Sequence, residues 1–186
     1  MRIIAGKARR LPLKTLPGKE TRPTTDRIKE TLFNMLSPYL EDAYFLDLFA
    51  GSGQIGLEAL SRGSARCVFV DNSKKACGVI ADNMSFTKLA DRCELMQMDA
   101  VSALCRLDGT CSFDLIFMDP PYQSGAEAEA LRVLAGSGLL KESTLIIVEA
   151  DLHTDFSYVT DMGFSIVREK IYKTNKHVFL QPGSRL

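Results

Sequence analysis

The chain has 186 residues, of which 46% are apolar and 25% charged, a composition typical of one folded domain. No apolar run approaches the roughly 20 residues that a membrane-spanning helix needs, and the polar start over residues 1–7 is unlike a secretory signal peptide. Five cysteines without C-x-x-C spacing argue against a disulfide scaffold and a zinc module. We therefore expect a cytoplasmic protein without a metal site or a membrane partner.

Charge is balanced overall but segregated along the chain. Residues 1–36 carry nine Lys and Arg against three Asp and Glu, residues 37–167 carry nine against nineteen, and residues 168–186 carry five against one. The net charges of +6, −10 and +4 sum to the zero of the whole chain. Uneven scatter of surface charge and a basic arm for a polyanion explain this pattern equally well.

The first 23 residues read as a basic β-hairpin extension that precedes the main domain over residues 24–186. Two short extended pieces flank a turn near residues 6–8, and prolines exclude a helix in this stretch. From Thr24, capping side chains followed by apolar residues at helical spacing predict a helix that ends before Pro38.

The main domain alternates apolar strands with helices, which predicts an α/β fold with a parallel sheet covered on both faces. Two final apolar runs, separated by a few residues, predict an antiparallel hairpin at the sheet edge. Both histidines, His153 and His177, are isolated and are expected at surface or edge positions. The expected strands cover 44–49, 67–71, 93–96, 113–118, 144–149, 164–168 and 177–180, and the expected helices cover 55–62, 74–88, 101–107 and 127–134.

A glycine-rich motif, G-x-G-x-x-G over residues 51–56, lies between the first strand and the next helix. Asp71 follows Gly51 by twenty positions, at the tip of the second strand, where an acid can accept hydrogen bonds from ribose hydroxyls. The motif alone fits a dinucleotide or S-adenosylmethionine. Asp47 favours the second, because a cationic amine has a use for that carboxylate. Asp99, beside Ala100, offers either a contact to an adenine amino group or a helix N-cap, and the two roles are compatible.

The most specific motif is Asp119-Pro120-Pro121-Tyr122, directly after the fourth strand of the sequence. Prolines fix the backbone and leave carbonyls without competing amide donors next to them. Asp119 and a proline carbonyl can then both accept hydrogen bonds from one exocyclic amine, while Tyr122 stacks on the base. Such chemistry depends on positioning more than on a strong base. We expect these four residues to be catalytic.

The segment 46–53 together with 119–122 resembles the class I S-adenosylmethionine-dependent amino-methyltransferases, and segments 22–27, 30–34 and 56–63 resemble the RsmD family of bacterial 16S rRNA (guanine-N2)-methyltransferases. The resemblance implies a three-layer Rossmann-like, seven-stranded sheet, mostly parallel with an antiparallel C-terminal hairpin. It also implies S-adenosylmethionine as cofactor and a guanine in 16S rRNA, free or in an assembling small subunit, as acceptor. Gln54, where a small or apolar residue is more usual, is expected to face solvent. The expected cofactor-binding residues are Asp47, Phe49, Ala50, Gly51, Ser52, Gly53, Asp71, Asn72, Asp99 and Ala100, with Arg22 and Thr24 flanking the cofactor.

An acidic body would repel RNA, so the phosphate backbone is expected on the basic arm, beside the pocket. Lysines 170, 173 and 176 either extend that surface or protect an edge hairpin. Other acceptors that fit the motifs are adenine N6 and a protein glutamine, and the glycine motif alone also fits an NAD-dependent oxidoreductase. A non-catalytic RNA-binding protein is a further alternative. The expected RNA-binding residues are Arg2, Lys7, Arg9, Arg10 and Lys14.

Overall fold

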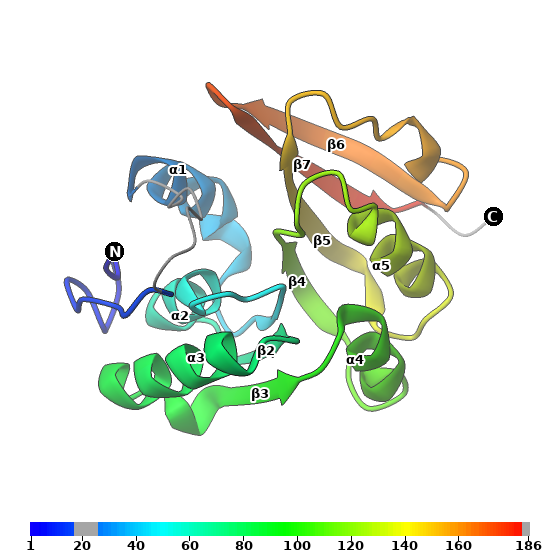
Figure 1. The fold of residues 1–186 in the computed structure, drawn as a ribbon. Coiled ribbons are helices and arrows are strands. Elements are labelled where there is room, and N and C mark those ends of the chain that lie inside the picture. The colour runs from blue at the N-terminus through cyan, green and yellow to red at the C-terminus, as the bar shows by residue number, and fades with distance from the viewer. Residues whose placement is uncertain (17–25, 184–186) are drawn as a thin grey trace.

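A computed structural model describes residues 1–16 and 26–183. Its centre is a seven-stranded sheet in the order β3-β2-β1-β4-β5-β7-β6 (Figure 1). The first five strands of this order are parallel, and β7 runs antiparallel to both β5 and β6. The strands are β1 (Tyr44–Leu48), β2 (Arg66–Asp71), β3 (Cys93–Gln97), β4 (Phe113–Met118), β5 (Leu140–Asp151), β6 (Phe164–Ile171) and β7 (Asn175–Pro182).

Helices cover both faces of the sheet and make three layers. Helices α1 (Asp26–Leu36), α2 (Gln54–Ser61) and α3 (Lys74–Thr87) contribute to one apolar core, and α4 (Ala100–Leu107) and α5 (Ala126–Ala135) contribute to the other. Successive strand residues alternate between these cores, as the pleat requires. Short 3-10 helices span Ser37–Tyr39, Ala90–Arg92 and Ser157–Val159. The predicted α/β sheet with its antiparallel hairpin is confirmed.

The hairpin lies at the sheet edge as predicted, but the expectation for His177 is wrong. Strand β7 is not at the edge, because β5 pairs with it on one side and β6 on the other. His177 on β7 is consequently fully buried rather than at the surface. Strand β6 forms the edge, and its side chains are mostly exposed.

The N-terminal segment packs on α2. A single antiparallel bridge joins Arg2 to Pro12, and Ile3, Ala8 and Leu13 enter the core on the α1–α3 face. The buried carboxylate of Glu58 accepts hydrogen bonds from the amides of residues 4 and 5, at 2.8 and 3.0 Å. These contacts hold the basic segment against the sheet domain. The predicted boundary at residue 23 lies outside the described residues.

Candidate active site

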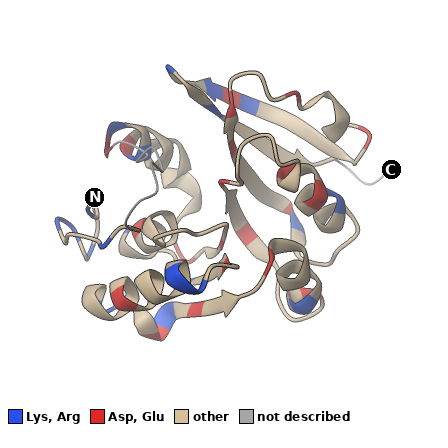
Figure 2. Ribbon diagram, in the orientation of Figure 1, with Lys and Arg blue, Asp and Glu red and all other residues tan. Residues whose placement is uncertain are grey.

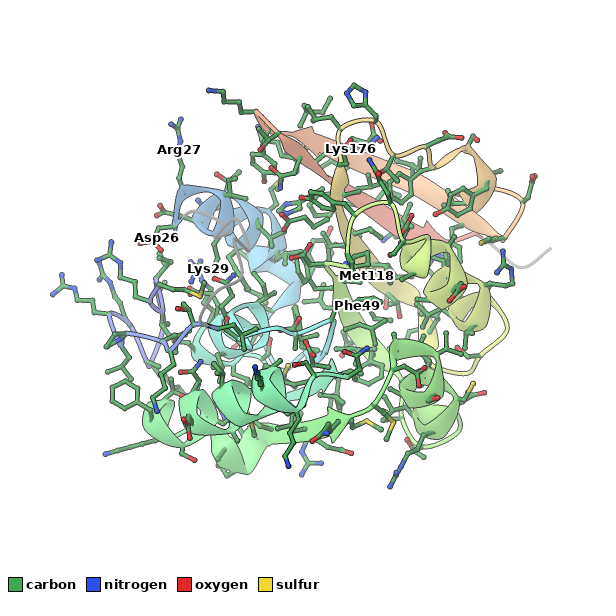
Figure 3. The ribbon with its side chains drawn as sticks, viewed as in Figure 1. Asp26, Arg27, Lys29, Phe49, Met118 and Lys176 are labelled. Atoms are coloured by element: carbon green, nitrogen blue, oxygen red, sulfur yellow. The ribbon has the colours of Figure 1, made fainter. Side chains whose placement is uncertain are left out.

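Two loops meet at the carboxyl edge of the sheet, after β1 and after β4. The chain leaves β1 toward β2 on one side and leaves β4 toward β5 on the other, so the strand order reverses between them. Leu48 and Met118 are register partners on these neighbouring strands, and Figure 3 shows Phe49 beside Met118. In open α/β sheets ligands bind at this switch point. The glycine-rich loop and the Asp119–Tyr122 tetrapeptide therefore share one edge.

The loop after β1 is held in a left-handed backbone conformation. The φ angles of Phe49, Gly51 and Gly53 are 71°, 59° and 74°. A bulky residue such as Phe49 rarely adopts a positive φ, and such strain concentrates at functional sites. The carboxylate of Asp71 fixes the loop by accepting a hydrogen bond from the Gly51 amide at 2.9 Å. A Cβ atom built on Gly51 would meet nothing within 4 Å, which leaves room for a ligand to approach the backbone.

Asp47 lies behind this loop. Its side chain is 2% exposed and accepts a hydrogen bond from the Gly56 amide at 2.9 Å. Burial raises the pKa of Asp47 to about 7, and the negative charge of Asp71 adds to the rise, whereas the Gly56 hydrogen bond opposes it. Asp47 thus ties β1 to the start of α2. Its expected contact with a cofactor amine stays a prediction.

The remaining predicted cofactor residues surround the same edge. Asp99 caps α4 by accepting a hydrogen bond from the Ser102 amide at 2.9 Å, and this bond holds the pKa of Asp99 below its ordinary value. Asn72 is exposed just beyond β2, Ala100 opens α4, Ala50 is buried in the loop, and the Ser52 carbonyl accepts from Asn83 at 2.9 Å. Arg22 and Thr24 lie outside the described residues.

Gln54 corrects an expectation. Its side chain does not simply face solvent: the amide oxygen Oε1 is inaccessible and has no hydrogen-bond partner among the described residues. Gln54 is the first residue of α2, directly after Gly53, and is half-buried.

The tetrapeptide after β4 presents acceptors. The Pro121 carbonyl accepts hydrogen bonds from the Ser124 amide at 3.2 Å and hydroxyl at 2.6 Å. Among the described residues no backbone donor bonds to the carbonyl of Pro120, a buried residue. Tyr122 is 45% exposed, as a stacking platform requires.

Asp119 is exposed to solvent, but the surrounding protein still desolvates its carboxyl group. This environment raises the pKa of Asp119 well above its ordinary value, first by desolvation and then by the negative charges of Glu149 and Asp47. The carboxyl group of Asp119 is thus both accessible and partly desolvated, which suits a group that must bind a polar substrate. The charges of Glu149 and Asp47 thus both act on Asp119 at this edge.

A buried polar cluster lies beside Asp119; its Glu149, at the end of the fifth strand, could be expected at the site mouth from the sequence, but its partners could not. Glu149 on β5 accepts a hydrogen bond from Asn175 Nδ2 at 2.7 Å, and its other oxygen lies 3.1 Å from Nε2 of His177. The Tyr172 hydroxyl lies 3.2 Å from Nδ1 of the same imidazole. Asn175 and His177, two apart on a strand, share a sheet face, and this spacing was the available signal. Their partner Glu149 comes from antiparallel pairing that the sequence does not specify.

Comparison with known proteins identifies the family. The family described as conserved hypothetical protein 95 matches residues 1–181. The ribosomal RNA small subunit methyltransferase D of Escherichia coli K12 is 38% identical over 173 residues, which are 92% of this chain and 84% of that protein. The chain belongs to the RsmD family. The protein of the same name from Haemophilus influenzae is 34% identical over 171 residues, 91% of this chain and 88% of that one.

Solved structures agree with the RsmD family assignment. The Escherichia coli protein yhhF has a TM-score of 0.88 and 33% identity, with 100% of this chain and 99% of that chain covered. A Thermus thermophilus protein, TTHA0928, has a TM-score of 0.83 and 27% identity, with 97% and 99% covered. SMU.776, solved in complex with SAH, shares the fold at a TM-score of 0.64 and 16% identity, over 82% of this chain and 49% of that one.

The basic arm of this RsmD-family chain is partly neutralised. Arg2 pairs with Asp26 at 2.9 Å and Lys14 with Asp82 at 2.7 Å, in exposed positions where such pairs contribute little. Lys7, Arg9 and Arg10 are exposed and have no carboxylate partner among the described residues. Figure 2 shows cationic residues on this segment and on β6. Lys176 is different, because it is 12% exposed, lies 3.5 Å from Glu169 and sits over the Phe156 ring.

Two further observations bound the site. A cavity of about 550 Å³ opens at the opposite edge of the sheet, between residues such as Tyr44, Arg66 and Cys111, and contains none of the predicted site residues. The strand-end geometry, rather than this hollow, therefore marks the candidate site. Among the described residues no group of three or more His, Cys, Asp or Glu side chains is placed to hold a metal, and no helix is long and apolar enough to cross a bilayer.

Proposed function

We propose that this protein is an S-adenosylmethionine-dependent methyltransferase that modifies the N2 amine of a guanine in 16S rRNA. The observation that carries the proposal is the meeting of two loops at the switch point between β1 and β4. One loop exposes glycine backbone to a ligand, and the other offers Asp119 and Pro120 as adjacent acceptors. The names of the relatives in Escherichia coli and Haemophilus influenzae support rRNA as the substrate class.

The residues at this edge fit the cofactor. Three features follow the ends of the neighbouring strands β1, β2 and β3. They are the open space beside Gly51, the acid Asp71 and the capping Asp99. Asp71 uses one lone pair on each oxygen for a loop amide, so each oxygen can still accept from a ribose hydroxyl. When bound, S-adenosylmethionine supplies a methyl group on a sulfonium that departs as a neutral thioether.

Asp119 and the Pro120 carbonyl then act on the base. Each accepts one N–H of the exocyclic amine, which turns the nitrogen lone pair out of conjugation and toward the methyl carbon. Once the amine has taken the methyl group that bound S-adenosylmethionine would supply, it would lose one proton to solvent or to the Asp119 carboxylate. The protein contributes mainly alignment, because a positioned pair of reactants avoids most of the entropic cost of encounter. Tyr122 stacks on the base, which must be unstacked from the RNA to enter.

The test is methyl transfer with tritiated S-adenosylmethionine to four candidate acceptors: unmodified 16S rRNA, small subunits that lack the modification, DNA and bulk protein. We expect label in rRNA or small subunits, located as N2-methylguanosine by nuclease digestion and chromatography. Label in N6-methyladenosine or in protein would replace the guanine assignment. A melting-temperature rise with NADH and none with S-adenosylhomocysteine would replace the cofactor.

A further inference from the structure

We propose that Glu149 selects guanine over adenine by accepting the N1–H of the target base while Asp119 accepts from its N2 amine. This inference rests on the proposed function and assigns a role to a residue that neither the glycine motif nor the tetrapeptide includes. It starts from a row of polar side chains that crosses the sheet beside the acceptor site.

The row follows from strand register. Met118 on β4 pairs with Val148 on β5, so the next residues, Asp119 and Glu149, are neighbours at the carboxyl edge. Glu149 pairs in turn with His177 on β7. Side chains in register on adjacent strands point to the same face, and the charge of Glu149 acts on Asp119. Adjacent strands lie about 4.8 Å apart, so side chains from the two strand ends can converge on one base edge.

Glu149 is built as a fixed acceptor. Asn175 donates to Oε1 at 2.7 Å and His177 Nε2 lies 3.1 Å from Oε2, while the His177 ring packs edge-on against Phe117 at 6.0 Å. A carboxylate has about four acceptor sites, so these two contacts orient the group without exhausting it. The Glu149 side chain is 8% exposed, which leaves a narrow accessible surface rather than a freely moving acid.

The chemistry of the base edge explains the selection. Guanine presents two adjacent donors, N1–H and the N2 amine, and two adjacent carboxylates match them. Adenine presents a lone pair at N1, which a buried carboxylate would repel. A site built to hydrogen-bond a donor rejects an analogue that lacks it, because a buried polar group is then left unpaired.

The experiment separates this role from the reaction itself. The methylated position is first mapped in rRNA, and ligated rRNA is then prepared with guanine or 2-aminopurine at that position. The 2-aminopurine base keeps the exocyclic amine but has a lone pair in place of N1–H. We expect the wild-type protein to methylate guanine at least about 100-fold faster in single turnovers. This comparison requires no variant and so does not depend on how any variant folds.

The variant Glu149→Gln then tests the residue. We expect its guanine rate to fall at least about 30-fold and its preference for guanine over 2-aminopurine to drop below about 10-fold, since a glutamine amide can donate to N1. Affinity for S-adenosylhomocysteine should stay within twofold. Glu142→Gln is the matched control: the same change on the same strand, at an exposed position on the far edge, should leave rate and preference unchanged.

The outcomes are distinguishable. N2-methylguanosine formation with equal preference in wild type and Glu149→Gln, or no wild-type preference for guanine, would overturn the role of Glu149 and leave the proposed function intact. Formation of a different methylated product by the wild type would overturn the proposed function and this inference with it.

Discussion

Two glycines of the G-x-G-x-x-G motif are expected to respond in different ways to replacement by alanine. At Gly51 the added methyl group would meet nothing within 4 Å, but the backbone has a φ of 59°. The left-handed conformation costs an alanine about 1–2 kcal/mol, so Gly51→Ala should fold with a modest loss of stability. Its methyl group would occupy the space where we place the cofactor. We expect affinity for S-adenosylhomocysteine to fall at least 10-fold.

At Gly56 the situation is reversed. The backbone is helical, but a methyl group would lie 2.4 Å from Cε1 of Phe69 and 2.5 Å from Sγ of Cys67, both buried. Overpacking costs about 1–3 kcal/mol and better helix propensity returns about 1 kcal/mol, so a net loss of up to about 2 kcal/mol follows. In a domain of this size that loss lowers the melting temperature by up to about 8 °C.

Calorimetric titration with S-adenosylhomocysteine and thermal melts of both variants measure these effects. The folded Gly56→Ala protein should bind within threefold of wild type. Wild-type affinity in Gly51→Ala, or an equal loss of affinity in both variants, would refute the placement of the cofactor over Gly51.

Three other predictions follow from the site. Asp119→Asn should lower methyl transfer about 100- to 10,000-fold with S-adenosylhomocysteine affinity unchanged, since it replaces a carboxylate used only on the base with a neutral amide. Because the pKa of Asp119 is raised, the wild-type rate should climb with pH as this group ionises. A parallel loss of cofactor binding would contradict the role. The pKa of Asp47 is raised from 3.8 to about 7 in the folded protein, so the protonated side chain stabilises the fold fully below about pH 4 and this stabilisation is lost as the pH rises to 7. Urea denaturation should show a change in the free energy of unfolding of up to about 1.4 kcal/mol per pH unit, which Asp47→Asn removes. An unchanged pH dependence in the variant would refute this prediction. Replacing Lys7, Arg9 and Arg10 by alanine should weaken RNA binding and reduce the slope of log affinity against log salt by about 2–3, whereas the double change Arg106→Ala and Arg132→Ala, on α4 and α5, should alter it far less.

The sheet could be predicted because each strand corresponds to a short, contiguous apolar segment of the sequence. Phe45, Leu46 and Leu48 are consecutive or nearly so, and all are buried between two helix layers, so apolarity on both faces was a direct sign of a central parallel strand. The glycines and the Asp119 tetrapeptide were readable for the same reason, since each motif is contiguous. Their shared edge followed from the parallel order.

Non-local register could not be predicted. The partnership of Glu149 with His177 depends on which strand enters the sheet beside β5, and the hairpin of β6 and β7 could equally have paired through its other member. The sequence showed an isolated histidine, and isolated histidines are poor evidence for a site. Burial of Gln54 Oε1 likewise depends on how the first turn of α2 packs, which a motif match does not describe.

This geometry offers an explanation for the segregation of charge along the chain. Asp47, Asp119 and Glu149 bring three carboxyl groups to the acceptor edge. When ionised, they favour a cationic methyl donor and the donor groups of a base but repel phosphates. A nucleotide can enter such a site only if its backbone is held elsewhere. The exposed cations of the arm and the exposed Arg168 on β6, with the half-buried Lys170 on the same face, are the groups that we propose for this contact. Under the proposed function, this separation of charge would let the cations hold the RNA backbone while only the base enters the acidic edge.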